Sequence, residues 1–176
     1  MRRRFSPFFI AVLVTVAGLC SQIACSRLAG TPPQPASSAN VLQVMRGILF
    51  PSSNVIFAAQ SDDPEKVEKA EDPATATDPL KSAYGGWEAV SNAGLALAES
   101  TRLLEVPRSC SNGKPAPIDG DTWKKGLTDL RAAGTAAYEA GKAKDQDKVL
   151  DAADKVVTAC STCHDAYREK TPRCTP

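Results

Sequence analysis

The feature that most constrains the fold is a stripe of apolar and small side chains between residues 80 and 104, spaced four or three residues apart. That spacing keeps one face of an α-helix apolar over about seven turns. A stripe that admits small residues is typical of a helix packed along other helices in a bundle. The series consists of Leu80, Tyr84, Trp87, Ser91, Gly94, Leu97, Thr101 and Leu104.

Three further segments share the helical period, and no segment sustains the alternation of a β-strand. The predicted helices span residues 41–60, 79–105, 121–141 and 146–170, with Pro51 expected to kink or interrupt the first. Asp78 is the predicted N-cap of the second helix, and Asp119 or Asp121 that of the third. The sequence therefore predicts an all-α, antiparallel up-down-up-down four-helix bundle.

The predicted buried faces follow from the same spacing. The third helix has its apolar face at Trp123, Leu127, Leu130, Gly134, Ala137 and Gly141. The last helix has it at Leu150, Ala153, Val157, Cys160, His164 and Tyr167. Within the second helix, two adjacent glycines at 85 and 86 should cost about 1 kcal/mol each against alanine, which suggests a close approach beside Trp87.

The N-terminal segment, residues 1–24, resembles a secretory signal peptide. Three arginines at 2–4 precede an apolar core at 8–19, which is too short to prefer spanning a bilayer. Residues 22–25 partly match a bacterial lipoprotein box, so lipidation of Cys25 and ordinary cleavage nearby are open alternatives. We expect a periplasmic or secreted protein, membrane-anchored if Cys25 is lipidated. Residues 25–39, rich in Pro, Ser and Ala, are predicted to be a flexible tether.

Residues 40–176 are of a size that suits one domain with one core. The whole chain carries a net charge of +1, and removal of the three signal arginines leaves −2. A nucleic-acid-binding surface would need a concentrated basic patch, which this balance does not suggest.

Near the C-terminus, Cys160-Ser161-Thr162-Cys163-His164 forms a C-x-x-C-H box. This is the pattern of covalent c-type haem attachment, with two thiols one helical turn apart and a histidine as the proximal iron ligand. A thioredoxin-like redox pair would call for a βαβ setting. A structural zinc site needs four ligands and would have to recruit Cys110 or Cys174. The sequence therefore predicts one covalently bound haem c.

The position of this box on the last helix distinguishes the chain from small cytochromes c, in which the box lies near the N-terminus. Residues 159–170 resemble the terminal helix of class II c-type cytochromes, the cytochrome c′ family and its low-spin relatives. The resemblance covers helix order and loop placement over about residues 40–170. It implies a haem inside the bundle, with the first helix closing the side opposite His164.

The sixth iron ligand is the open question that the resemblance raises. Low-spin relatives carry a methionine on the first helix, where this chain has Met45. Methionine is also a common filler of apolar cores, which is the alternative role for Met45. Trp87 and Arg168 are further candidates for the haem pocket, Trp87 against the porphyrin edge and Arg168 one turn after His164. Plain helix–helix packing is the alternative role for Trp87, and a favourable interaction with the helix dipole is the alternative for Arg168.

Cys110 and Cys174 form a second constellation. In the predicted bundle, the loop that carries Cys110 lies at the same end as the C-terminus of the last helix. Because the chain is expected outside the cytoplasm, where disulfides persist, we predict a bridge between these two cysteines.

These features predict an electron carrier rather than an enzyme, with haem iron ligated by His164 and Met45 and with redox proteins as partners. The alternative is a five-coordinate, high-spin protein that binds NO or another small gas. Peroxidase-like turnover would need a distal acid–base residue, and the chain has no second histidine. Members of the family often form homodimers, and the sequence leaves the oligomeric state open.

Overall fold

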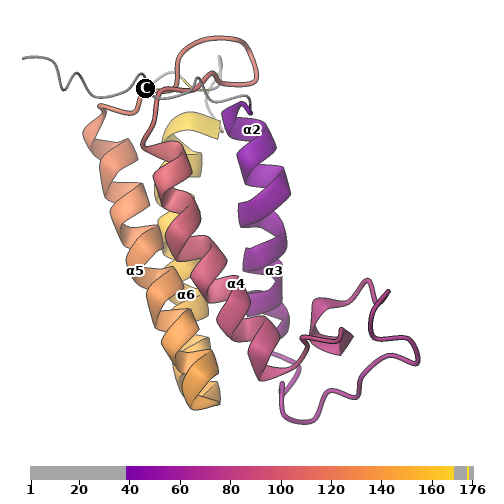
Figure 1. Cartoon of the computed structure of the whole chain (residues 1–176). Coiled ribbons are helices and arrows are strands. Elements are labelled where there is room, and N and C mark those ends of the chain that lie inside the picture. Colours follow the sequence, from indigo (N-terminus) through magenta and orange to yellow (C-terminus); the bar gives the residue numbers. More distant parts are fainter. Residues whose placement is uncertain (1–38, 169–173, 175–176) are drawn as a thin grey trace, which may run out of the picture. The chain divides into compact units, whose positions relative to one another are not determined.

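The computed structural model describes residues 39–168 and Cys174. Over these residues it is all-helical, with four helices packed against each other (Figure 1). Within the described residues the only strand-like feature is an isolated bridge between Ser109 and Pro115. The predicted helical bundle is confirmed at this level. The signal segment 1–24, Cys25 and residues 26–38 lie outside the described residues.

The first helix consists of α2 (Val41–Val44), the π-helical turn η2 (Met45–Leu49) and α3 (Phe50–Ala58). Asn40 begins it with a capping box, in which its side chain and that of Gln43 each accept from the other residue's backbone N–H. Pro51 was expected to kink or interrupt this helix, and the chain remains helical through it. Proline removes the hydrogen bond to the residue four positions earlier and crowds that carbonyl. The wider π turn just before Pro51 accommodates this change.

One stretch of this helix, Val41–Ala58, is long and apolar enough to pass a length and composition test for a membrane span, with a mean hydropathy of 1.3. A helix that lines the core of a bundle passes the same test. Of this stretch, 28% is buried inside the structure, and several of its apolar residues line the cavity described below.

The second helix begins later than predicted. Pro79–Lys81 forms a short 3-10 turn, η3, capped by the Asp78 side chain, and α4 itself spans Trp87–Ser100. Gly86 precedes α4 with a φ of +59°, a left-handed conformation that suits glycine and ends the preceding turn. The two glycines are therefore at the helix start, not inside it. Tyr84, predicted on the buried stripe, lies in the connecting loop and is 68% exposed.

The remaining elements lie close to their predicted positions. The 3-10 turn η4 (Thr101–Leu104) extends α4, and α5 spans Asp121–Ala143. The predicted aspartate cap of α5 is wrong, because Gly120 occupies the cap without a side-chain hydrogen bond. The last helix consists of α6 (Gln146–Cys163) and a second π-helical turn, η5 (His164–Arg168). Asp145 caps α6 by accepting from the Lys148 backbone N–H.

The buried face of α6 agrees only in part with the predicted face. Leu150 and Val157 are 38% and 48% exposed, whereas their neighbours Val149 and Val156 are fully buried. Both sets fit the helical period, so periodicity alone could not choose between them. Ala153 is fully buried as predicted, and from Cys160 onward the predicted residues lie on the buried side or line the cavity.

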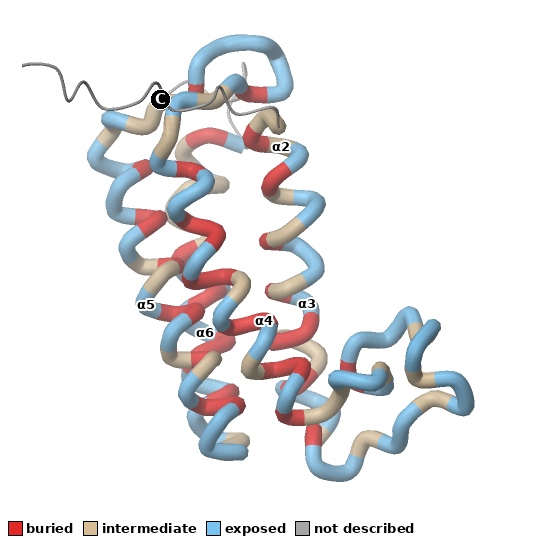
Figure 2. Tube along the Cα trace, in the orientation of Figure 1, coloured by how far each residue is buried: buried red, intermediate tan, exposed pale blue. Residues whose placement is uncertain are grey.

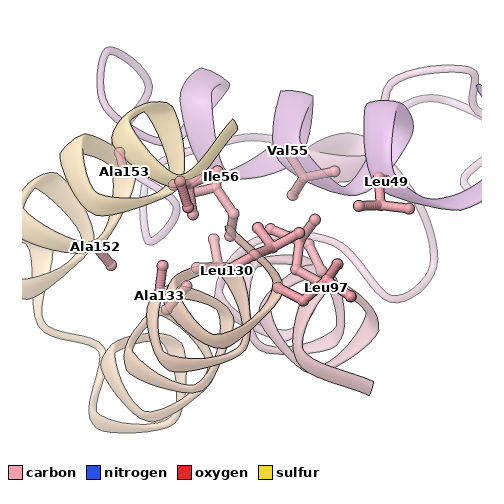
Figure 3. Close-up of a cluster of buried hydrophobic side chains, with 14 of the residues drawn as sticks. Leu49, Val55, Ile56, Leu97, Leu130, Ala133, Ala152 and Ala153 are labelled. Carbon is pink, nitrogen blue, oxygen red and sulfur yellow. The ribbon is translucent and has the colours of Figure 1, made fainter. Parts of the chain in front are cut away.

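We call one end of the bundle the closed end: residues 91–98 of α4, 133–141 of α5 and 149–156 of α6. Here small residues bring backbones into contact. A Cβ added at Gly134 would lie 2.6 Å from the Ala98 nitrogen, and one added at Gly141 would lie 2.7 Å from the Ser91 nitrogen. Alanines and valines fill the rest, and Ile56 of α3 packs beside them (Figure 3). Buried positions line the inner sides of the helices, whereas the loop at residues 60–86 is mostly exposed (Figure 2).

Candidate functional site

The other end of the bundle, which we call the hollow end, surrounds a cavity of about 510 Å³. The hollow end comprises residues 41–53, 97–104, 123–130 and 159–168, so each of the four packed helices contributes residues to the cavity wall. Such a volume lies within the range of about 300–1,000 Å³ common for ligand pockets. The apolar wall includes Val41, Leu42, Leu49, Leu97, Leu104, Leu127 and Leu130.

The C-x-x-C-H residues line this cavity together. Cys160 and Cys163 end α6, one turn apart, and both are unpaired thiols of intermediate burial. Burial raises the pKa of the Cys160 thiol. Burial, followed by smaller effects of Cys160 and Asp129, raises the pKa of Cys163 to about 11. Both thiols are therefore protonated at neutral pH, unlike the low-pKa thiols of redox-active pairs.

His164 begins the π-helical turn η5 and lines the cavity beside the two cysteines. Its backbone N–H donates to the carbonyls of Cys160 and Ser161, which fixes the backbone that carries the imidazole. Short π-helical turns are rare in proteins, but those that do occur are frequently found at functional sites.

Met45 lies in the cavity wall contributed by the first helix and is partly buried against the core. It begins the other π-helical turn, η2, so both predicted iron ligands start a segment of this kind. Arg46 and Arg168 also line the cavity, and both residues are exposed. The structure thus brings a thioether, an imidazole and two thiols to one largely apolar cavity with two guanidinium groups among its exposed lining residues.

Trp87 does not line the cavity. It begins α4, whereas the cavity touches this helix only from Leu97 onward. Ten helical residues separate the two positions by about 15 Å along the axis. The indole of Trp87 belongs to the hydrophobic core and not to the cavity lining.

Trp123, and not Trp87, is the tryptophan that lines the cavity. It was predicted only as a core residue of the third helix, and it is buried, but it also lines the cavity. Its Nε1–H donates to the Leu104 carbonyl at 3.0 Å, and its ring meets the edge of Tyr167 at a centroid distance of 5.4 Å. The sequence did offer one signal for this role: Trp123 stands at the start of a predicted helix, one turn before Gly126, on the apolar stripe that includes Leu127 and Leu130.

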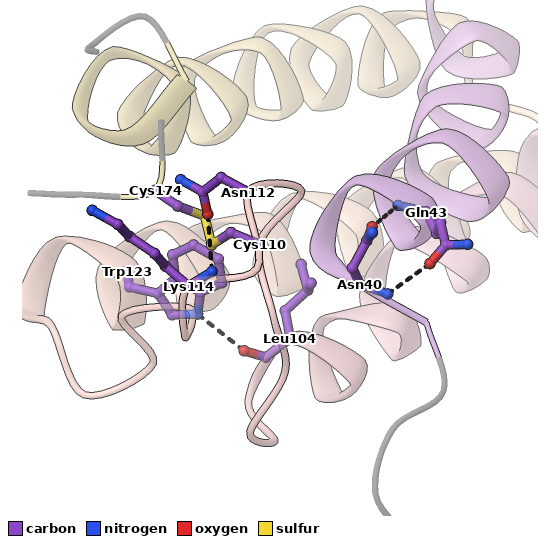
Figure 4. Close-up of a disulfide and its surroundings, with 8 residues drawn as sticks. All are labelled: Asn40, Gln43, Leu104, Cys110, Asn112, Lys114, Trp123 and Cys174. Atoms are coloured by element: carbon purple, nitrogen blue, oxygen red, sulfur yellow. Dashed lines mark hydrogen bonds between the residues drawn. A yellow bond between two sulfur atoms is a disulfide. The ribbon is translucent and has the colours of Figure 1, made fainter. Parts of the chain in front are cut away.

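A disulfide joins Cys110 to Cys174 at this end of the bundle, with the two Cα atoms 6.2 Å apart (Figure 4). The Cys174 backbone N–H also donates to the Tyr167 carbonyl at 2.8 Å. In the same loop, the Ser109 carbonyl accepts from the Val41 backbone N–H at 2.9 Å. The loop at residues 105–120 therefore ties the start of the first helix to the end of the last one, beside the cavity.

Among residues 39–168 and Cys174, no group of three or more His, Cys, Asp or Glu side chains is placed to hold a metal ion. The zinc alternative would have needed Cys110 or Cys174, which are bonded to each other. A scan against protein-family models found no match, and neither did searches of curated proteins and of solved structures. The chemistry of the site must therefore be inferred from its own residues.

Proposed function

We propose that this protein is an exported monohaem c-type cytochrome that carries electrons between redox proteins. Cys160 and Cys163 would hold the haem covalently, and His164 and Met45 would ligate its iron. The observation that carries the proposal is that all four residues line one cavity. Bound haem would supply an iron that gains and loses one electron.

The residues fit such a group in three respects. The cavity is large, and most of the residues that line it are apolar. The two thiols are one helical turn apart on its wall. Arg46 and Arg168, both exposed lining residues, could pair with carboxylates at the edge of a bound group.

Each side chain has a distinct role in this proposal. The thiols fix the group in one orientation, and the backbone of η5 sets the direction of His164. A thioether ligand from Met45 favours the reduced state and raises the reduction potential, which suits electron transfer. Trp123 and Tyr167 add apolar surface and exclude water from the same wall.

The proposed architecture is the antiparallel up-down-up-down bundle of class II c-type cytochromes. It is supported by the contacts between α4 and α5, where Ser91 meets Gly141 and Ala98 meets Gly134, so residue numbers rise on one helix as they fall on the other. In that topology the start of the first helix and the end of the last one share the hollow end. Electron transfer needs only an exposed edge there and a docked partner.

The test is to produce the full chain in bacteria that attach haem to exported proteins, beside the Cys160→Ala/Cys163→Ala variant as a matched control. Intact mass should show one haem on the wild-type chain and none on the control. Wild type without covalent haem would contradict the proposal.

The choice between electron transfer and gas binding needs a second measurement. The ferric wild-type protein should give a low-spin optical spectrum with a far-red sulfur-to-iron band, which Met45→Ala should lose. Reduced wild type should bind carbon monoxide poorly and the variant readily. A high-spin spectrum that Met45→Ala leaves unchanged would make Met45 a core residue and favour a five-coordinate gas-binding protein.

A further inference from the structure

We infer that Gly126 is a positioning residue for Cys163, because it leaves the space that the Cys163 sulfur needs when it is bonded to haem. This inference rests on the proposed function. Gly126 lies on α5, one turn after Trp123, and faces the cavity across from the end of α6.

The geometry around Gly126 is specific to this sulfur. A Cβ added to Gly126 would lie closer than 3.0 Å to the Cys163 Sγ, a separation that real Cβ atoms essentially never show. The next nearest atoms, the Cys163 Cβ at 3.7 Å and the Ala159 carbonyl oxygen at 3.9 Å, are at ordinary contact distance. The space left by this glycine is therefore occupied by the thiol of the C-x-x-C-H box.

The other buried glycines of α5 differ in what they face. Gly134 and Gly141 lie against backbone atoms of α4, so a side chain at either position would push two helices apart. Gly126 lies against the end of a single flexible side chain. Gly126 is therefore not needed for the close approach of two helices, and its substitution should affect the Cys163 side chain rather than the distance between helices.

The free thiol could avoid an added methyl group by rotating about χ1, since rotamers are separated by modest energies. A sulfur that is bonded to haem could not rotate in this way. In attachment, the thiol S–H adds across a vinyl C=C bond: an S–C bond and a C–H bond form, the S–H bond and the π bond are lost, and no oxidant or reductant is consumed. The sulfur is then held between the Cys163 Cβ and the ring, so Gly126→Ala should obstruct this thioether while leaving the apoprotein folded.

Gly126→Ala tests this inference, with Cys163→Ala as a second background and Gly47→Ala as the matched control. Gly47 is a helical glycine near the cavity with nothing within 4 Å of an added Cβ. Each chain is produced with haem attachment, then denatured, and its free thiols are counted by alkylation and intact mass. Pyridine haemochrome spectra report whether a vinyl group remains unreacted.

Wild type and Gly47→Ala should carry haem with neither Cys160 nor Cys163 alkylated. Gly126→Ala should carry haem with Cys163 alkylated and a red-shifted haemochrome band. In the Cys163→Ala background, adding Gly126→Ala should not change haem content, because the obstructed sulfur is already gone.

Consumption of both thiols in Gly126→Ala at the wild-type yield would overturn the inference. So would an equal loss of haem in both backgrounds, or loss of the helical circular dichroism of the apoprotein in both, since Gly126 would then serve general packing. These outcomes differ from failure of the proposed function, in which wild type itself carries no covalent haem.

Discussion

At the closed end of the bundle, α4 and α5 meet through their backbones, whereas at the hollow end the helices surround a cavity lined by larger side chains. Gly94, Gly134 and Gly141 make the contacts at the closed end. Trp123, Leu127 and Leu130 of α5 instead line the cavity. The two ends meet at Leu97, which is fully buried.

This difference separates stability from function along one set of helices. Close backbone approach buries small residues at native packing density and leaves little room for change. Large side chains around a cavity can change what the cavity holds without altering how the helices meet. The stretch of α5 that carries Gly126 lies at the cavity, although it includes a glycine as the closely packed stretch around Gly134 does.

The largest effect is expected from removing the disulfide, which tests whether the hollow end depends on a covalent tie. Cys110→Ala/Cys174→Ala should lower the free energy of unfolding by about 4 kcal/mol in the chain-entropy model, since the bridge joins residues 64 apart in sequence. Urea unfolding of wild type and variant measures the loss. Hydrogen exchange should increase first in residues 105–120 rather than at the closed end. Uniform loss of protection would contradict the comparison between the two ends.

A glycine substitution at each end compares them directly. In the apoprotein, Gly94→Ala should lower the free energy of unfolding by about 1–3 kcal/mol, because its Cβ would lie within 2.8 Å of the Gly134 carbonyl oxygen. Gly126→Ala should cost less, because the Cys163 thiol can rotate away. Urea unfolding of both variants gives the difference. Equal costs would mean that the two ends are packed alike.

A smaller effect should follow from Trp123→Phe, which tests how the cavity wall is held. The variant keeps an aromatic ring against Tyr167 but removes the hydrogen bond to the Leu104 carbonyl. The expected cost is about 1–2 kcal/mol, since the carbonyl is left without this donor. Thermal unfolding of the apoprotein measures it, with Trp87→Phe as the control in the core away from the cavity.

The smallest effect concerns alkaline pH, and only the hollow end should show it. The Cys163 thiol has a pKa of about 11 in the folded apoprotein, against an ordinary value of 9.0. The unfolded chain therefore releases this proton first, so stability is fully present below pH 9.0 and falls as pH rises toward 11. Urea midpoints across this range should fall in wild type and fall less in Cys163→Ala. Identical profiles would show that Cys163 is not the group responsible.

Much of the bundle could be predicted because helical period is a local property. The stripe on α4 from Trp87 onward and the six positions on α5 are buried or half-buried as expected. The start of α4 was missed because one positive φ at Gly86 overrides the apolar spacing that continues back to Leu80. Two positions on the face of α6, Leu150 and Val157, were misjudged because the residues one position earlier fit the same period.

The two tryptophans show where prediction of the site stopped. Trp87 and Trp123 each stand near the start of a helix on an apolar stripe, and nothing local distinguishes them. Which one reaches the C-x-x-C-H residues depends on which end of its helix lies beside the end of α6. In the proposed topology that is the start of α5, so Trp123 rather than Trp87 lines the cavity.

The C-x-x-C-H box and the helical periods could be read directly from the sequence, because each depends on residues within a few positions of one another. It takes the folded chain to show that Met45, Trp123, Gly126 and His164 line one cavity, and that Gly126 faces a sulfur atom whereas Gly134 faces backbone atoms. The physical reason is that a cavity is bounded by residues far apart in the chain. Their distances are set by how closely small side chains let the helices approach elsewhere.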